Sequence, residues 1–249
     1  MVSFSLLLLG VMLMILKILP VWFFFLLLLV YLLFLLIVST NIRFNFFVKA
    51  YNSNPKVSGK KVAITFDDGP SENTLKILDL LEQYDVKCGF FCIGKEVEQR
   101  PQIFREIIRR GHMVGNHTFS HTRKMGFLSS SKILDEIIRC DEIVEKTAGL
   151  KMKLFRPPFG IINPKTQKAL QQSKHKVIGW NVRSYDAIVN SPDLVLKRIT
   201  RKIKPGDVIL LHDNNPQSLE ILEQLLIFLQ TNHYKAVRPD NLFGIDAYS

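Results

Sequence analysis

Thr65-Phe66-Asp67-Asp68-Gly69-Pro70 decides the fold of this chain, and it directly follows the apolar run Val62-Ala63-Ile64. β-Branched residues bounded by a Gly-Pro pair are typical of a buried strand, so the run predicts a strand that ends at the two aspartates. Folds of the α/β class place their ligands at such carboxyl ends. Because adjacent residues of an extended chain point to opposite sides, we expect one carboxylate to bind a metal and the other to handle a proton. The alternative is a surface turn, which Asp, Gly and Pro all favour.

Strand and helix patterns alternate through the rest of the chain. The strand patterns lie at 62–64, 88–94, 113–115, 154–155, 176–182, 208–211 and 236–237. The helix patterns lie at 72–84, 101–110, 130–148, 164–173, 193–203 and 219–231. About seven strands that alternate with helices predict an α/β fold with a parallel sheet, closed or nearly closed.

An apolar leader precedes this domain, and between Phe4 and Val38 its only strongly polar residue is Lys17. A single helix of about 35 residues would measure about 52 Å, whereas the hydrocarbon core of a bilayer is about 30 Å thick. We therefore expect either one long tilted span or two short spans, at 3–19 and 21–38, interrupted at Lys17 and Pro20. A cleaved signal peptide is disfavoured because the leader has no charged start and its apolar run is too long.

Three regions follow from these patterns: a transmembrane anchor at 1–40, a linker at 41–60 and a mixed polar and apolar domain at 61–249. The linker is expected from the polar residues, Gly59 and Pro55 that it contains. The sequence leaves open on which side of the membrane the domain lies. A hairpin or a tilted span places the domain outside, whereas Arg43, Lys49 and the lysines after them favour the cytoplasm under the positive-inside rule.

The composition bounds the partners of the chain. It carries 33 Lys and Arg against 22 Asp and Glu, a formal charge of +11. The basic residues are scattered along the predicted helices, without a recognition helix, a zinc finger or an aromatic RNA-binding motif, so we expect no nucleic-acid partner and a charged face near a membrane. Three cysteines, Cys88, Cys92 and Cys140, form no disulfide framework and are expected as small buried apolar residues.

The segment His117-Thr118-Phe119-Ser120-His121 sets two imidazoles four residues apart. On a helical turn this spacing places both rings on one face, where they suit a single metal ion. Together with a carboxylate from Asp67-Asp68 they predict a His-His-Asp site with open positions, which is typical of a catalytic zinc or a similar divalent ion. The alternative is a pair of surface histidines.

Two later strand ends also carry polar residues. In Arg156-Pro157-Pro158-Phe159-Gly160 the prolines stiffen the loop and have no amide hydrogen, so the N–H of Phe159 is the next donor and could stabilise an oxyanion. In Leu210-Leu211-His212-Asp213 a histidine ends an apolar strand. The alternative for the first stretch is a rigid loop with a surface arginine. The alternative for the second is a histidine that only makes a structural hydrogen bond.

These four stretches, in this order, resemble the motifs of the carbohydrate esterase family 4 polysaccharide deacetylases over about residues 60–240. The resemblance implies a distorted (β/α)7 barrel, here preceded by one or two transmembrane segments. It implies metal-dependent hydrolysis of N-acetyl groups on sugar polymers, with release of acetate. The divalent metal would be Zn²⁺ in the first place, with Co²⁺ or Ni²⁺ as alternatives.

The resemblance also implies a role for each matching residue. Asp67 would be the general base, oriented by Arg156. The metal ligands would be Asp68, His117 and His121. The Phe159 amide would form the oxyanion hole with the metal, and Leu210 would line the pocket for the acetyl methyl group. His212 would be the general acid, held by Asp186, which would raise its pKa.

Two positions depart from the family pattern. Asp186-Ala187 stands where the family usually has Asp-Trp, so one wall of the groove is expected to be open and substrate preference is in question. Phe159 replaces the usual Tyr, a small loss if only its backbone acts.

The resulting hypothesis is a membrane-anchored deacetylase of an N-acetylglucosamine polymer of the cell envelope: peptidoglycan, a chitin-like chain or an exopolysaccharide. The lipid bilayer and an N-acetylated polysaccharide would be its partners, with the catalytic domain on the extracytoplasmic side of the plasma or inner membrane. The alternatives are an O-acetyl esterase of xylan-like glycans and an inactive glycan-binding membrane protein. Transport through the leader is disfavoured because it offers almost no polar groups for a substrate path.

Overall fold

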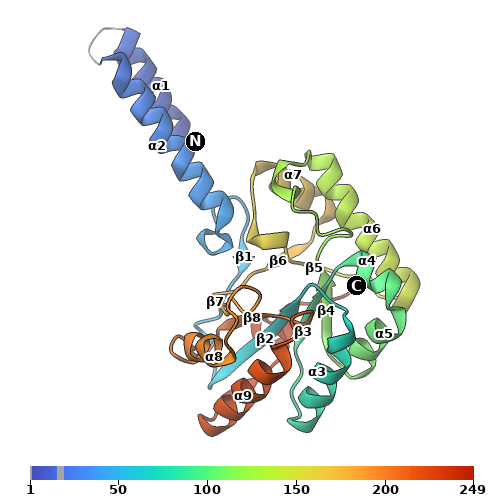
Figure 1. Cartoon of the computed structure of the whole chain (residues 1–249). Helices are drawn as coiled ribbons and strands as arrows, with labels where there is room; N and C mark the ends of the chain where they lie inside the picture. The colour runs from blue at the N-terminus through green and yellow to red at the C-terminus, as the bar shows by residue number, and fades with distance from the viewer. Residues whose placement is uncertain (1, 16–19) are drawn as a thin grey trace.

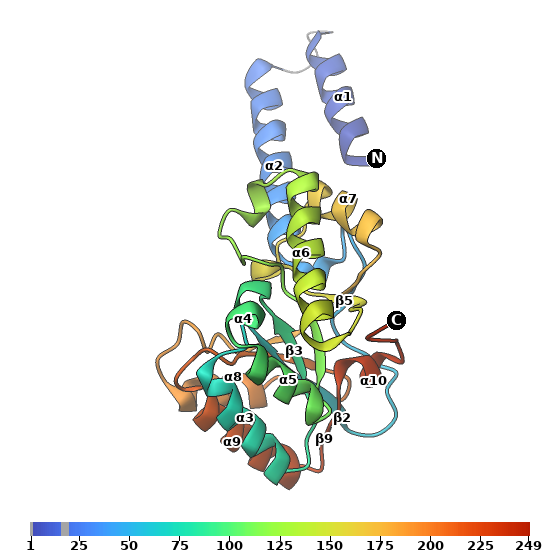
Figure 2. The ribbon, with the colours of Figure 1, turned by 90° about the vertical axis from the view of Figure 1, so that its right-hand side faces the viewer.

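The computed structural model describes residues 2–15 and 20–249, and it consists of a helical hairpin that projects from an α/β domain (Figure 1). The hairpin is formed by α1 (Val2–Ile15) and α2 (Val21–Thr40), which lie side by side in both views (Figure 2). The interruption expected at Lys17 lies outside the described residues.

Helix α2 is, within the described chain, the one helix long and apolar enough to cross a membrane by length and composition. Only 6% of its most apolar window is buried, so it is not a core helix of the domain. Helix α1 has 14 residues, about 21 Å, and is shorter than the hydrocarbon core of a bilayer. A signal sequence near the N-terminus can have the same profile as α2, and the membrane anchor stays a prediction.

A curled parallel sheet forms the centre of the domain. Its order is β1-β6-β5-β4-β3-β2-β8-β7, with β9 beside the start of β2. The strands are β1 (Ala50–Tyr51), β2 (Lys61–Asp67), β3 (Gly89–Cys92), β4 (Met113–Asn116), β5 (Leu154–Phe155), β6 (Lys176–Ile178), β7 (Val182–Arg183), β8 (Val208–His212) and β9 (Lys235–Ala236). In that order β1 and β7 are the two ends, so the expected barrel takes the form of an open, curled α/β sheet.

The helices cover the outside of this sheet (Figures 1 and 2). They are α3 (Glu72–Gln83), α4 (Gly94–Gln99), α5 (Pro101–Arg109), α6 (Ser130–Ala148), α7 (Pro164–Ser173), α8 (Pro192–Thr200), α9 (Ser218–Thr231) and α10 (Pro239–Phe243). Local signals set several boundaries: a capping box at Ser71 starts α3, and Gly149 in the left-handed region ends α6. The sequence patterns did not indicate α4, α10 and β1, which are short.

The expected strand at 176–182 is two strands, β6 and β7. The chain leaves the ladder at Gly179 and Trp180, and the carbonyls of Ile178 and Gly179 accept hydrogen bonds from the Arg156 side chain instead. A buried side chain therefore takes over the backbone groups that a continuous strand would have paired.

Strand β2 is central, and its residues from Val62 to Asp67 are all buried. Burial on both faces explains why its sequence is a continuous apolar run. The register with β8 sets Asp67 opposite His212 and Thr65 opposite Leu210. The carboxyl ends of neighbouring strands thus bring the polar motifs to one edge of the sheet.

The stretch 41–60, expected as a linker, contains η1 (Ile42–Phe44) and β1 and packs against the domain. Ile42 and Ala50 are buried, β1 pairs with β6, and the N–H of Asn54 donates to the carbonyl of Gly206 at 2.8 Å. The division into an anchor, a linker and a catalytic domain stays a prediction, but the stretch is not a free tether.

Candidate active site

Asp67 and Asp68 line the same cavity of about 390 Å³ at the carboxyl end of β2. The expectation that the two side chains point to opposite sides is wrong because the chain is not extended at Asp68, whose φ is 76°. This left-handed residue turns the second carboxylate back toward the first. Asp67 is buried, whereas the side chain of Asp68 is 20% exposed.

His117 and His121 meet Asp68 in this cavity. The Asp68 Oδ1 atom lies 3.5 Å from His117 Nε2 and 3.4 Å from His121 Nε2. The histidines follow β4 on a loop, not on a helical turn, with positive φ at Thr118 and His121. Their rings are nevertheless 4.8 Å apart, because this folded loop returns the second imidazole to the first.

The donor set of Asp68, His117 and His121 fits a divalent metal ion. One ligand atom from each lies within 4.8 Å of the others. Zinc bonds nitrogen at about 2.0–2.1 Å, so neighbouring ligand atoms of a tetrahedral site are about 3.3 Å apart. The observed separations from Asp68 are close to that value. Three protein donors beside an open cavity leave room for a water molecule or a substrate.

Hydrogen bonds and charges prepare these donors. The Nδ1 atom of buried His117 lies 2.7 Å from the carbonyl oxygen of Arg156, so that nitrogen carries a hydrogen and Nε2 faces Asp68. Burial and the nearby His117 lower the pKa of His121 to about 4. Burial raises the pKa of Asp68, but the hydrogen bond and charge of His117 outweigh it and hold that pKa well below its usual range.

Arg156 is fully buried and fixes Asp67. Its Nη1 atom donates to Asp67 Oδ1 at 2.7 Å and to Thr65 Oγ1 at 2.8 Å. Its other nitrogens donate to the carbonyls of Ile178 at 3.0 Å and Gly179 at 2.9 Å. A guanidinium with all these partners cannot swing away, so Asp67 keeps one carboxylate oxygen bound and the other, 3.8 Å from His117 Nε2, toward the cavity.

His212 lines the same cavity and is held in place by Asp186. The Nδ1 atom of His212 lies 2.8 Å from Asp186 Oδ1, and its backbone N–H donates to Asp186 Oδ2 at 2.8 Å. Ser184 Oγ adds a hydrogen bond of 2.6 Å to Asp186. Burial alone would lower the pKa of His212, but the hydrogen bond and charge of Asp186, with Asp67 and Asp68, raise it to about 9. His212 is therefore an imidazolium at neutral pH.

The remaining expected residues, Phe159 and Leu210, line the same cavity. Phe159 has φ 59°, and in the described structure its backbone N–H, the first after two prolines, donates to no protein acceptor. The residue is 41% exposed, and its ring lies 4.8 Å from the ring of His121. Leu210 is buried beside Thr65 in the β2–β8 pair. Phe159 thus contributes a ring contact as well as its amide.

Several residues of this site were not identified from the sequence. Thr65 and Ser184 hold Arg156 and Asp186 by their hydroxyl groups. Trp180, Arg183 and Tyr185 line the cavity together with exposed Ala187, which was expected at its wall. The only available signal was their position next to predicted strand ends, because a wall residue needs no distinctive spacing.

Comparisons with known proteins agree with this geometry. A profile of the polysaccharide deacetylase family matches residues 54–178. A peptidoglycan-N-acetylglucosamine deacetylase of Bacillus cereus is 33% identical over 199 residues, which cover 78% of this chain and 72% of that protein. The Bacillus subtilis peptidoglycan-N-acetylmuramic acid deacetylase PdaC is 32% identical over 184 residues, 74% of this chain but only 38% of its own length. A crystal structure of a peptidoglycan N-acetylglucosamine deacetylase superposes with a TM-score of 0.73 at 32% identity and covers 80% of this chain and 94% of the other.

Proposed function

Because this chain belongs to the polysaccharide deacetylase family, we propose that it removes N-acetyl groups from an N-acetylglucosamine-containing polysaccharide of the cell envelope. The resemblance expected from the four motifs is confirmed at the level of the family, and with it the assignment to the deacetylase hydrolases. The observation that carries the reaction type is the cavity in which Asp68, His117 and His121 converge beside Asp67 and His212.

A divalent cation would be held by Asp68, His117 and His121, and we favour Zn²⁺ over Co²⁺ or Ni²⁺. When bound, such an ion supplies Lewis-acid chemistry, which acidifies water and polarises a carbonyl group. Both imidazoles would be neutral and the carboxylate ionised in the ion-bound site, because ligands must be deprotonated to bind.

Asp67 would act as the general base. One of its oxygens is occupied by Arg156 at 2.7 Å, which leaves the other oriented toward the cavity. A base that is held by a buried guanidinium stays in the geometry needed to accept a proton from attacking water. Arg156 is accordingly a positioning residue, and it acts through Asp67.

His212 would act as the general acid. The amine that leaves when an acetamide is cleaved must be protonated, and His212 carries a proton at neutral pH because its pKa is about 9. Asp186 binds Nδ1, so the Nε2–H of the same ring is the proton available to the leaving nitrogen. Asp186 thereby sets both the orientation and the charge of the acid.

The Phe159 amide and Leu210 would receive the acetyl group. A backbone N–H without a protein acceptor is suited to stabilise negative charge that develops on the carbonyl oxygen. The buried Leu210 side chain offers an apolar surface for the methyl group. This arrangement would favour acetyl over larger acyl groups.

The named relatives indicate the substrate class. The relatives from B. cereus and B. subtilis are named as peptidoglycan deacetylases, of N-acetylglucosamine and of N-acetylmuramic acid respectively. We propose a cell-envelope glycan with N-acetylglucosamine for this chain. Ala187, which lines the cavity and is exposed, would admit a chain with substituents on that side.

We also propose that α2 anchors the catalytic domain to the plasma or inner membrane, on the extracytoplasmic side. The support is the length and exposure of this apolar helix. An envelope glycan would be accessible to the domain from that position.

Acetate release tests the function. The full chain, purified in a neutral detergent, is incubated with chitotetraose, peptidoglycan and acetylated xylan, with and without a chelator. We expect acetate from the first two substrates, loss with chelator, and recovery on addition of Zn²⁺. Acetate from xylan alone would replace the proposal with O-acetyl esterase activity. Absence of acetate from all three would refute it.

A further inference from the structure

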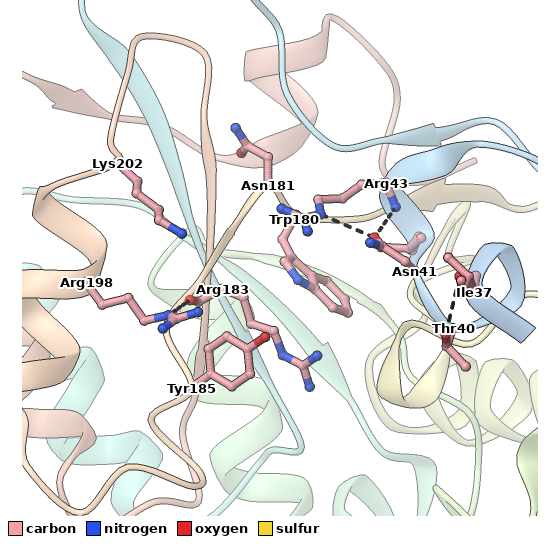
Figure 3. Close-up of a pocket in the computed structure, with 11 residues that line it drawn as sticks. Ile37, Thr40, Asn41, Arg43, Trp180, Asn181, Arg183, Tyr185, Arg198 and Lys202 are labelled. Atoms are coloured by element: carbon pink, nitrogen blue, oxygen red, sulfur yellow. Dashed lines mark hydrogen bonds between the residues drawn. The ribbon is translucent and has the colours of Figure 1, made fainter.

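A second cavity, of about 330 Å³, lies between the end of α2 and α8 (Figure 3). We call it the basic pocket, and its lining is Ile37, Thr40, Asn41, Ile42, Arg43, Trp180, Asn181, Arg183, Tyr185, Arg198 and Lys202. It shares Trp180, Arg183 and Tyr185 with the active-site cavity, so the two are neighbours across these three side chains. Its size falls within the range of small-molecule sites, about 300–1,000 Å³.

The basic pocket is positively charged without compensation. Four cationic side chains line it, and no carboxylate does. Throughout the described ranges, 2–15 and 20–249, none of these four forms an ion pair. Unpaired cations that converge on a cavity repel one another, which an anionic ligand would relieve.

Stacking on Tyr185 holds two of the cations in place. The guanidinium of Arg198 lies 4.1 Å from the centre of the Tyr185 ring, and that of Arg183 lies 4.8 Å from it. Figure 3 shows Arg183 and Arg198 beside this ring. The Nε atom of Arg198 also donates to the carbonyl of Arg183 at 3.3 Å. Arginines with restrained planes and remaining N–H groups match the oxygens of a phosphate group.

The opposite wall is the last turn of α2, and it is attached to the domain. The N–H of Ile162 donates to the carbonyl of Ser39 at 2.9 Å, and Ile42 is buried in the same cluster as Trp180. Arg43, two residues beyond Asn41, enters the pocket from this side. The basic pocket therefore has a fixed position at the end of the candidate membrane span, where lipid headgroups would lie.

We propose that the basic pocket binds the phosphate of an anionic membrane phospholipid. The proposal rests on the proposed membrane insertion of α2. Headgroup phosphates are the anions present at that depth, and Trp, Tyr, Arg and Lys are the side chains enriched at membrane interfaces. Binding there would hold the neighbouring active-site cavity close to the bilayer surface.

The exposed face of α8 favours a lipid over a charged glycan. Leu194 is 60% exposed, and with Lys197, Arg198, Arg201 and Lys202 it lines a shallow cavity next to the basic pocket. An exposed leucine among cations is typical of a helix that lies on an anionic membrane surface. Asp193, in the first turn of α8, is the exposed carboxylate on this helix and lines neither cavity.

Trp180 offers a direct test. The chain has two tryptophans, Trp22 and Trp180. The substitution Trp22→Phe leaves Trp180, in the wall of the pocket, as the single tryptophan whose fluorescence is measured. In this background and in neutral detergent, the full chain is titrated with dihexanoyl phosphatidylglycerol and with dihexanoyl phosphatidylcholine. The pocket variant is Arg198→Gln with Lys202→Gln. The control, Lys76→Gln with Lys235→Gln, removes the same charge from exposed positions on α3 and β9, away from the hairpin (Figure 2).

We expect the parent and the control to bind phosphatidylglycerol more tightly than phosphatidylcholine. In the pocket variant the ratio of the two affinities should fall by about 30-fold, because two cations are removed and each contributes about 1 kcal/mol near an anionic surface. Equal preference in all three proteins would overturn the proposal. So would equally tight binding of glycerol phosphate, which would indicate a site for soluble anions, or competition by chitotetraose, which would indicate a glycan site.

Acetate release from chitotetraose, measured in the same samples, separates this proposal from the proposed function. A pocket variant that deacetylates normally but has lost the lipid preference supports the lipid site. A parent protein that keeps the lipid preference and releases no acetate would refute the deacetylase and leave the lipid site standing.

Discussion

At the residue scale, the two adjacent aspartates differ because the backbone between them turns. Asp67 ends a buried strand and is held by Arg156, whereas Asp68 has φ 76° and lies against two imidazoles. Neighbours in sequence thus have different partners: Asp67 is held by a cation of the protein, and Asp68 lies beside two histidines.

This difference predicts that Asp67→Asn and Asp68→Asn lose activity for different reasons. Asp67→Asn should lower kcat by about 10²–10⁴-fold, as loss of a general base does, and keep bound zinc. Asp68→Asn should weaken zinc binding by more than about 10–100-fold. That is the loss typical of removing a residue that only hydrogen-bonds a metal ligand, and Asp68 would be a ligand itself. Metal content after dialysis, measured by elemental analysis, distinguishes them. Equal zinc loss in both variants would contradict the assignment.

The charge of His212 predicts the alkaline limit of activity. Its pKa of about 9 lies above the ordinary 6.5, so the acid is protonated below about pH 9 and the rate should fall as the pH rises through that value. In Asp186→Asn the lowering effect of burial remains while the hydrogen bond to a carboxylate and its charge are gone. The descending limb should therefore move to lower pH, which a pH profile of kcat measures.

His212→Ala is the matched control for this profile. It should reduce turnover by about 10²–10⁴-fold, remove the limb and spare zinc binding. A profile of Asp186→Asn that overlies the wild-type profile would show that another group sets the alkaline limit.

At the scale of elements, the site depends on strand register. Pairing of β2 with β8 sets Asp67 opposite His212, and the same strand pairs with β3, which leads to β4 and His117. A shift of one residue in β2 would turn its side chains to the other face of the sheet. The segment before β2 helps to fix this register through the contact of Asn54 with Gly206, in the turn before β8.

Gly206 predicts the cost of disturbing that contact. A side chain there would place its Cβ atom 2.0 Å from the carbonyl oxygen of Asn54, and φ is 89°. Gly59 has a similar φ of 74° but no atom within 4 Å of the added carbon. Gly59→Ala should lower the free energy of unfolding by about 1 kcal/mol through backbone strain alone. Gly206→Ala should lower it by about 1–3 kcal/mol more, because the added carbon also clashes with Asn54. Chemical denaturation of both variants would show this order, and equal losses would refute it.

At the scale of the whole molecule, the hairpin is not joined to the domain by a free linker. Ile42 and Ala50 are buried in the core of the domain, and β1 extends its sheet at β6. The orientation of the domain relative to α2 is therefore restrained by packing, which also shapes the basic pocket.

Truncation tests this attachment. A protein of residues 41–249 keeps Ile42, β1 and the Asn54 contact, whereas one of residues 55–249 loses all three. Full burial of an apolar side chain contributes about 1.5–3 kcal/mol, so the shorter protein should unfold at a lower denaturant concentration. Because both truncated proteins lack α2, we expect both in the soluble fraction, whereas the full chain should be found in the membrane fraction. Identical midpoints would mean that residues 41–54 do not stabilise the domain.

The amino-acid sequence alone determined the α/β class, the central apolar strand, most helices and the residue types of the site. These features depend on local patterns: apolar runs, helical spacing, caps, and polar residues placed directly after strands. The family resemblance followed from the same four stretches. Short elements such as α4 and β1 were missed because a few residues carry little pattern.

Only the tertiary structure decided which side chains meet. Residue spacing did not indicate the left-handed backbone at Asp68 or the folded loop from His117 to His121. It also did not indicate that two backbone carbonyls hold Arg156. The basic pocket joins residues 37–43 to residues 180–202, which no local pattern connects. The physical reason is that contacts between distant segments depend on sheet register and packing, which the whole chain sets together.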